Sequence, residues 1–192
     1  MNLPAPLDAV DAALRQHFGQ LPARASVSFV GVDAIEVLRF EPVPDERAYL
    51  SLGMARHPMT GASALTRSDD GPRAELMLHI RDGADRHLDV WRQVALLAAS
   101  PAVEAIVYSS GMTVDLGGPI ASGSRCTGGL IVPAPIGPIE ATPGPVDVLQ
   151  ILPATGTELA WCRVHGGPAL LARWAERDTD LLDLGRVAVA LD

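Results

Sequence analysis

One alternating stretch constrains the fold more than any other part of the chain. The run Arg73-Ala-Glu-Leu-Met-Leu-His-Ile80 places an apolar residue at every second position, which is the period of a strand with one buried face. Upstream, Tyr49-Leu-Ser-Leu-Gly-Met-Ala-Arg-His-Pro-Met59 begins as an apolar strand, breaks at Gly53 and enters a loop. The two strands are predicted to form the middle of a sheet. Glu75 is expected to be solvated or paired with an arginine across the sheet.

The remaining elements follow from apolar spacing and from proline and glycine signals. Strands are predicted over 26–30, 35–40, 130–133 and 146–152, with 103–109 as a strand or an extended link and 187–191 as an edge strand. Helices are predicted over 7–18, from about Leu88 to a stop at Pro101, from a capping box at Thr155 and Glu158 to Gly166, and from Pro168 onward with Leu171 and Trp174 inward. Residues 58–72 are predicted to form a loop.

The grouping of these elements predicts the fold class. About six or seven strands cluster in groups with four helices between the groups, which favours α+β over a strictly alternating α/β fold. We expect a central mixed, largely antiparallel sheet with helices packed on its faces. With 192 residues and an apolar fraction of 48%, the chain is expected to fold as one domain over 1–192.

Charge and composition exclude several classes of function. All 15 basic residues are arginine, so a Schiff-base lysine, a P-loop lysine and a Ser-Lys dyad are absent. The net charge is -8 and no basic stripe is visible, which argues against nucleic-acid binding and suits solubility or a basic partner. No charged and apolar leader opens the chain, and no apolar run approaches the ~20 residues of a membrane helix. We expect a cytoplasmic protein without membrane contact.

Residues that could carry chemistry are scattered. The segment 117–129 is rich in glycine but leads into a predicted strand, so we expect a surface loop and not a phosphate cradle. The five histidines form no metal-ligand spacing. The two cysteines, Cys126 and Cys162, could pair, although free thiols are the commoner state without a signal peptide. No catalytic, metal or cofactor residue is therefore assigned.

Cys126 supports the one enzymatic alternative. Its neighbour Arg125 could lower the thiol pKa, and a cysteine hydrolase would also need His57 or His79 within reach. The plainer interpretation is a small, half-buried side chain at the start of a strand.

Read in order, six segments resemble the suppressor-of-fused family, most strongly over 47–175. They are Tyr49-Leu-Ser-Leu-Gly-Met-Ala, Gly71-Pro-Arg-Ala-Glu-Leu-Met-Leu-His-Ile80, Trp91-Arg-Gln-Val-Ala-Leu-Leu-Ala98, Ser110-Gly-Met-Thr-Val114, Val148-Leu-Gln-Ile-Leu-Pro153 with the Glu158-Leu159 helix, and Gly167 to Trp174.

The resemblance implies a non-enzymatic, protein-binding domain, and for a bacterial single-domain member an immunity protein that neutralises a toxin. Animal members bind transcription factors through an aspartate and a tyrosine, whose positions correspond here to Met112 and about Ser100. That particular peptide recognition is therefore not expected in this chain. Candidate partner-binding residues are those of the loop after the Tyr49 strand and of the Ser-Gly corner: Arg56, His57, Ser110, Gly111, Met112 and Thr113. A structural or dimer-forming domain, with an exposed sheet edge at the C-terminal tail, is a third possibility.

Overall fold

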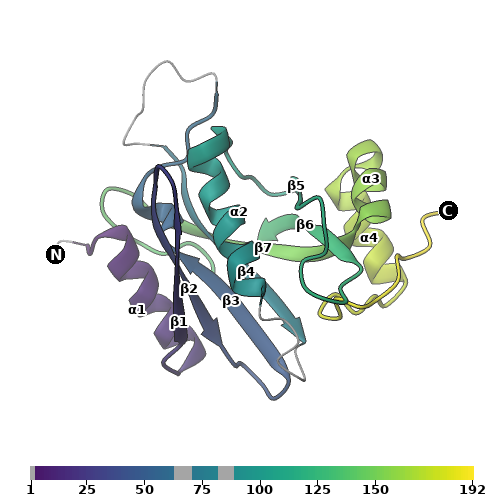
Figure 1. Ribbon diagram of the computed structural model, residues 1–192, viewed down its shortest axis with the longest axis horizontal. Coiled ribbons are helices and arrows are strands. Elements are labelled where there is room, and N and C mark those ends of the chain that lie inside the picture. The colour runs from purple at the N-terminus through teal and green to yellow at the C-terminus, as the bar shows by residue number, and fades with distance from the viewer. Residues whose placement is uncertain (1–2, 63–70, 82–88) are drawn as a thin grey trace.

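A seven-stranded sheet organises the computed structural model, which describes residues 3–62, 71–81 and 89–192 (Figure 1). The strands are β1 (Ala23–Phe29), β2 (Val32–Phe40), β3 (Glu46–Leu52), β4 (Arg73–Arg81), β5 (Thr113–Asp115), β6 (Cys126–Pro133) and β7 (Val146–Thr155). The helices are α1 (Pro6–Phe18), α2 (Val90–Glu104), α3 (Gly156–His165) and α4 (Gly167–Glu176), with a short 3-10 helix, η1 (Met54–Arg56). The predicted 58–72 loop and the predicted helix start at Leu88 lie partly outside the described residues.

The predicted fold class is confirmed. The strand order is β1-β2-β3-β4-β7-β6-β5, and every neighbouring pair is antiparallel except β4 and β7, which run parallel. The alternating strand and its apolar partner, β4 and β3, are adjacent near the middle of the sheet, with Tyr49 opposite Leu78. The sheet is therefore mixed and largely antiparallel.

Helices cover both faces of the sheet because the strand residues alternate between them. Val37 of β2 and Leu76 of β4 pack with α2 in the largest apolar cluster. Leu38 of β2 and Met77 of β4 face the other way and pack with α1. At the far end of the sheet, α3 and α4 pack on β6 and β7 in a third cluster that includes Trp174. The predicted inward position of Leu171 is wrong, because Leu170 is the buried residue.

The prediction that Pro101 stops the helix is also wrong, since α2 continues to Glu104. A proline inside a helix leaves the carbonyl four residues earlier without its N–H donor. Here that carbonyl belongs to Leu97, and the hydroxyl of Tyr108 donates to it at 2.9 Å. Burial raises the pKa of Tyr108 to about 12, so the hydroxyl keeps its proton. The tyrosine replaces the missing donor, and residues 105–109 then form an irregular link without a strand.

Replacing Tyr108 by phenylalanine is expected to lower the free energy of unfolding by about 1–3 kcal/mol, because the Leu97 carbonyl becomes a buried, unpaired acceptor. Chemical denaturation at neutral pH measures the loss. The control is the same change in a Pro101→Ala background, where the backbone N–H of residue 101 can take over. In that background Tyr108→Phe should lower the free energy of unfolding by less than about 1 kcal/mol. An equal loss in both backgrounds would contradict the proposed replacement.

The start of β6 and the C-terminal tail differ from the sequence-based prediction. β6 begins at Cys126 and not at Leu130, and Gly128 and Gly129 lie inside it. A Cβ on Gly129 would come within 2.5 Å of an Ile151 methyl, so the strand pairing itself requires a glycine there. The tail over 187–191 forms no strand, so the predicted sheet edge is not at the C-terminus. The outermost strands are β1 and β5.

Candidate functional site

The turn that follows β3 presents two of the predicted partner-binding residues. The backbone bends at Gly53, whose φ of 147° is favoured only by glycine, and continues through η1 to His57. The side chains of Arg56 and His57 are 44% and 67% exposed. Both approach the carboxylate of Asp33 on β2, at 3.7 Å from Arg56 Nε and 3.1 Å from His57 Nε2. The ion pair of Arg56 and the hydrogen bond of His57 join the turn to the neighbouring hairpin.

Beneath this turn lies Glu75, and the prediction that it is solvated or paired with an arginine across the sheet is wrong. Glu75 is fully buried, and one carboxylate oxygen accepts the N–H groups of Gly53 and Ala55 at 2.8 and 3.0 Å. The other accepts the hydroxyl of Ser51. Because β3 bends away at Gly53, these N–H groups have left the strand ladder, and the carboxylate satisfies them. Burial raises the pKa of Glu75, although the three hydrogen bonds oppose the rise.

The carbonyl side of the same turn is held by Arg73. Its guanidinium donates to the carbonyls of Ala55 and Arg56 at 2.9 and 2.8 Å, and the residue is only 6% exposed. Glu75 therefore accepts from the N–H groups of one short turn, and Arg73 donates to the carbonyl groups of the same turn. This arrangement fixes the backbone from which Arg56 and His57 project.

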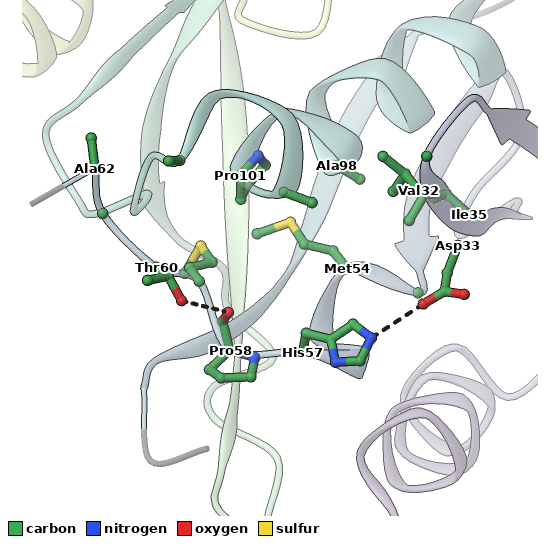
Figure 2. Close-up of a pocket in the computed structure, with 16 residues that line it drawn as sticks. Val32, Asp33, Ile35, Met54, His57, Pro58, Thr60, Ala62, Ala98 and Pro101 are labelled. Atoms are coloured by element: carbon green, nitrogen blue, oxygen red, sulfur yellow. Dashed lines mark hydrogen bonds and ion pairs between the residues drawn. The ribbon is translucent and has the colours of Figure 1, made fainter. Parts of the chain in front are cut away.

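A pocket of about 470 Å³ opens beside the turn (Figure 2). Its walls come from four places: the start of β2, η1, the loop after His57, and the C-terminal turns of α2. Met54 lies between the helix that carries Ala98 and Pro101 and the segment that carries His57 (Figure 2). The lining is about as polar as it is apolar, and the polar side chains Asp33, His57 and Thr60 contribute to it.

The other predicted residues, Ser110 to Thr113, form a corner at the opposite end of the 105–109 link. The N–H of Gly111 donates to the carbonyl of Ile131, whose own N–H donates to the carbonyl of Met112, both at 2.8 Å. Thr113 begins β5. Ser110 is exposed and lines a smaller hollow of about 290 Å³. No hydrogen bond or ion pair recorded among the described residues joins this corner to Arg56 or His57, so the structure leaves the six residues in two groups.

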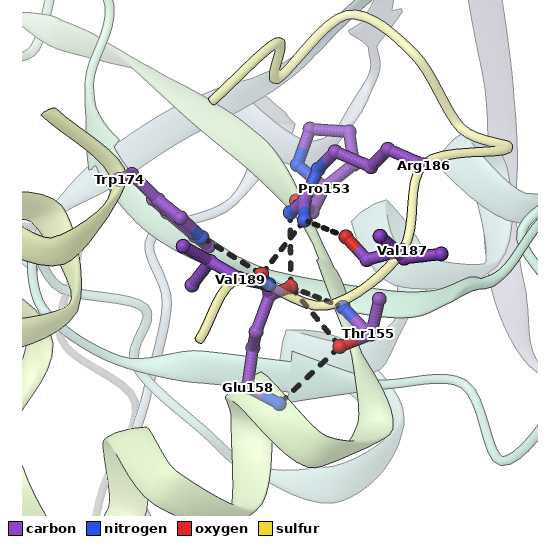
Figure 3. A network of polar contacts seen from close by, with 7 residues as sticks. All are labelled: Pro153, Thr155, Glu158, Trp174, Arg186, Val187 and Val189. Atoms are coloured by element: carbon purple, nitrogen blue, oxygen red, sulfur yellow. Dashed lines mark hydrogen bonds and ion pairs between the residues drawn. The ribbon is translucent and has the colours of Figure 1, made fainter. Parts of the chain in front are cut away.

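A second buried polar cluster fastens the C-terminal segment (Figure 3). Glu158 is fully buried and accepts two hydrogen bonds from Arg186, at 2.7 and 2.9 Å. It also accepts from Trp174 Nε1 and from the N–H groups of Thr155 and Val189. Burial alone would raise the pKa of Glu158, but these donors, with Arg186 the largest contributor, hold it below its usual value. The capping box predicted at Thr155 and Glu158 is confirmed and is one part of this cluster.

Cys126 does not have the surroundings of a nucleophile. Both cysteines are free, and Cys126 is fully buried and not half-buried as expected. Burial raises the pKa of its thiol to about 11, against a smaller lowering by Arg186, so the expected lowering by Arg125 is wrong. His57 contacts Asp33 and His79 contacts Glu46 at 2.9 Å. Neither histidine forms a recorded hydrogen bond with the thiol.

Across 3–62, 71–81 and 89–192, no three histidine, cysteine or acidic side chains come together as metal ligands would. In that part of the chain no helix has the length and apolarity to cross a membrane.

Sequence reasoning missed the residues that support the turn. Asp33, Arg73 and Glu75 stand in a hairpin and a strand with no motif around them. The usable signal was Gly53, because a glycine that ends a buried strand leaves backbone donors to be satisfied by a neighbour.

Solved structures similar to this chain include the following three. One described as the Sufu-Fu complex matches with a TM-score of 0.69 and 16% identity, over 97% of this chain and 93% of that chain. A SUFU homologue from Neisseria gonorrhoeae FA 1090 matches with 0.68 and 19%, over 96% and 97%. Drosophila Suppressor of Fused matches with 0.71 and 18%, over 97% and 51%, so this chain spans about half of its length. At these identities the likeness shows a shared fold.

Compared with curated proteins by sequence, the chain has no match. The sequence model of one family, described as Suppressor of fused protein (SUFU), does match it, over residues 31–187. That range contains the six segments quoted from the sequence and most of the seven-stranded sheet. The chain therefore belongs to the suppressor of fused family.

Proposed function

We propose that this chain is a non-enzymatic protein-interaction domain whose partner contacts Arg56 and His57 and the Ser110–Thr113 corner. The observation that carries the proposal is the fixed turn at the end of β3. A buried glutamate and a buried arginine hold four backbone groups of that turn, and two exposed side chains project from it beside a pocket. Preformed surfaces of this kind bind partners with little ordering cost.

The relatives support the same class of function. One solved structure with this fold is described as a complex of Sufu with Fu, and family membership makes a protein partner the natural expectation here. The surroundings of Cys126 favour this class over the hydrolase alternative. A thiol with a pKa of about 11 is almost entirely protonated at neutral pH, and the thiol is not the nucleophilic form.

Within this class we propose the role of an immunity protein that neutralises a toxin in the cytoplasm. The resemblance to bacterial single-domain members motivates the role, and the net charge of -8 suits a basic partner, because opposite net charges accelerate association. The toxin would be encoded by a gene beside this one.

The test is co-expression with the product of the neighbouring gene. We expect a complex that survives size-exclusion chromatography, and growth of cells that the neighbouring product alone would kill. Arg56→Ala and Met112→Ala should each weaken the complex about tenfold or more, measured by titration calorimetry, if they are central contacts. The matched control is Arg163→Ala, which removes another exposed, ion-paired arginine, on α3.

Each result has a distinct meaning. A complex without rescue of growth would support the function as a protein-interaction domain and contradict the immunity role. Binding that is unchanged in both Arg56→Ala and Met112→Ala would remove the proposed surface. If no complex forms and no growth is rescued, the proposed partner is wrong.

A further inference from the structure

We propose that the pocket beside η1 is an anchor site for a partner segment that carries a long apolar side chain next to a lysine or arginine. The proposal rests on the proposed function and names the chemistry that the partner must offer. It concerns the pocket of about 470 Å³ described above, which is larger than one side chain and of the size at which proteins bind compact apolar groups.

The pocket walls favour an apolar occupant. Val32, Ile35, Met54 and Met59 contribute side chains to the lining, and Ala98, Pro101, Ala102 and Ala105 of α2 and its end leave room because they are small. Methionine side chains adapt to ligands of different shape. An apolar side chain that enters from a partner would therefore contact these apolar walls, while a polar or charged neighbour could meet the polar part of the lining.

Exposed apolar residues extend this surface beyond the pocket. Val30 is 105% exposed at the tip of the β1–β2 hairpin, next to the lining residues Gly31 and Val32. Val103 is 64% exposed on α2, next to the lining residue Ala102. Exposed apolar side chains near a hollow are typical of a surface that a partner covers.

The charge at the mouth selects a cation beside the apolar group. The carboxylate of Asp33, 58% exposed, is on one wall. The C-terminus of α2 forms the other wall, and a helix of 15 residues ends there with no basic residue in its last turn. Such an end carries roughly half a negative charge, and Glu104 is exposed in the same turn. Arg56 offsets part of this charge through its ion pair with Asp33, and His57 contacts the same carboxylate, while the chain as a whole carries -8.

The pocket needs little rearrangement to bind. Met54 is in η1, whose backbone is held by Glu75 and Arg73. A wall whose backbone is already ordered loses little conformational entropy when a partner binds. More of the contact free energy is then expressed as affinity.

The experiment selects short random peptides from a displayed library on the wild-type protein. We expect selected peptides to share a leucine, methionine, isoleucine or phenylalanine adjacent to lysine or arginine. Ala102→Trp, which fills the pocket from an exposed position, should weaken a selected fluorescent peptide about tenfold or more. Asp33→Asn should weaken peptides with the basic residue and leave variants lacking it unchanged. Val164→Trp, at a residue 78% exposed on α3, is the matched control, and thermal melts verify folding of all three.

Several outcomes would overturn the proposal. Selected peptides without the apolar and basic pair, or unchanged binding to Ala102→Trp, would show that the pocket is not the anchor. A wild-type dimer that Ala102→Trp converts to a monomer would show that a second copy fills it. If the neighbouring gene's product binds Ala102→Trp at full strength but not Arg56→Ala, the proposed function survives and this inference fails.

Discussion

Replacing Arg186 by alanine is expected to lower the free energy of unfolding by about 3–5 kcal/mol at neutral pH. The guanidinium makes two hydrogen bonds to the fully buried carboxylate of Glu158 and a third to the carbonyl of Pro153, at 2.8 Å. Its removal leaves a buried negative charge without its cation. Urea denaturation followed by circular dichroism measures the loss.

The pH dependence separates this mechanism from simple loss of packing. In the wild type the pKa of Glu158 lies below the ordinary 4.5, so its contribution to stability is present above about 4.5 and is lost as the pH falls further. Without Arg186, burial dominates and the pKa rises. The variant should therefore approach the wild type in stability as the pH falls toward 4.5 and below, because its carboxylate takes up a proton first.

Two control variants test the assignment. Arg163→Ala removes an exposed ion pair with Asp115, whose partners are 54% and 39% exposed, and should cost less than about 1 kcal/mol. Glu158→Gln combined with Arg186→Met removes both charges and should recover part of the stability lost in Arg186→Ala. The loss of stability in the double variant should be smaller than the sum of the losses in Glu158→Gln and Arg186→Met measured separately. If the two losses simply add, the buried charge is not the cause.

This cluster also shows where sequence reasoning ends. Thr155 and Glu158 were identifiable as a capping box because both partners lie within one helical turn. The larger role of Glu158 depends on Trp174, Arg186 and Val189, which are 16, 28 and 31 residues away. Periodicity fixes which residues share a face of one element, but it carries no information on which distant donors meet.

The same limit applies to Pro101. A proline inside a helix is a valid local signal for the end of that helix. Here the helix continues because Tyr108, seven residues later in an irregular link, donates to the Leu97 carbonyl that the proline leaves without a donor. By contrast, the sheet could be predicted in outline, since the β3 and β4 patterns depend only on alternation within each strand. Of the candidate site, the exposed turn at Arg56 and His57 was predictable from Gly53 and Pro58, whereas the support beneath it was not.

Replacing Glu75 by alanine is expected to lower the free energy of unfolding by about 3–5 kcal/mol. Two backbone N–H groups and one hydroxyl lose their acceptor inside the protein, and each unpaired buried group costs about 1–3 kcal/mol, reduced where water can enter. Glu75→Gln keeps one acceptor oxygen for the N–H groups and should lose less. Glu36→Ala, which removes an exposed carboxylate paired with Arg24, is the control and should change stability by less than about 1 kcal/mol.

The pH profile of Glu75→Gln tests the burial of the charge. Because burial raises the pKa of Glu75 above the ordinary 4.5, the folded protein holds a proton that the unfolded chain has released. Stability of the wild type should therefore fall as the pH rises from 4.5 through the raised pKa. Glu75→Gln has no such proton, so its stability relative to the wild type should improve over the same window. A constant difference between the two proteins would contradict a raised pKa.

The effect should extend from stability to binding, because Glu75 supports the turn although it is itself fully buried. Hydrogen exchange at the amides of Gly53 and Ala55 should be slow in the wild type, faster in Glu75→Ala and intermediate in Glu75→Gln. Arg56, His57 and the Met54 wall of the pocket depend on that backbone, so partner affinity should fall in the same order. If binding were unchanged while these amides exchanged freely, the fixed turn would not be what presents the interaction surface.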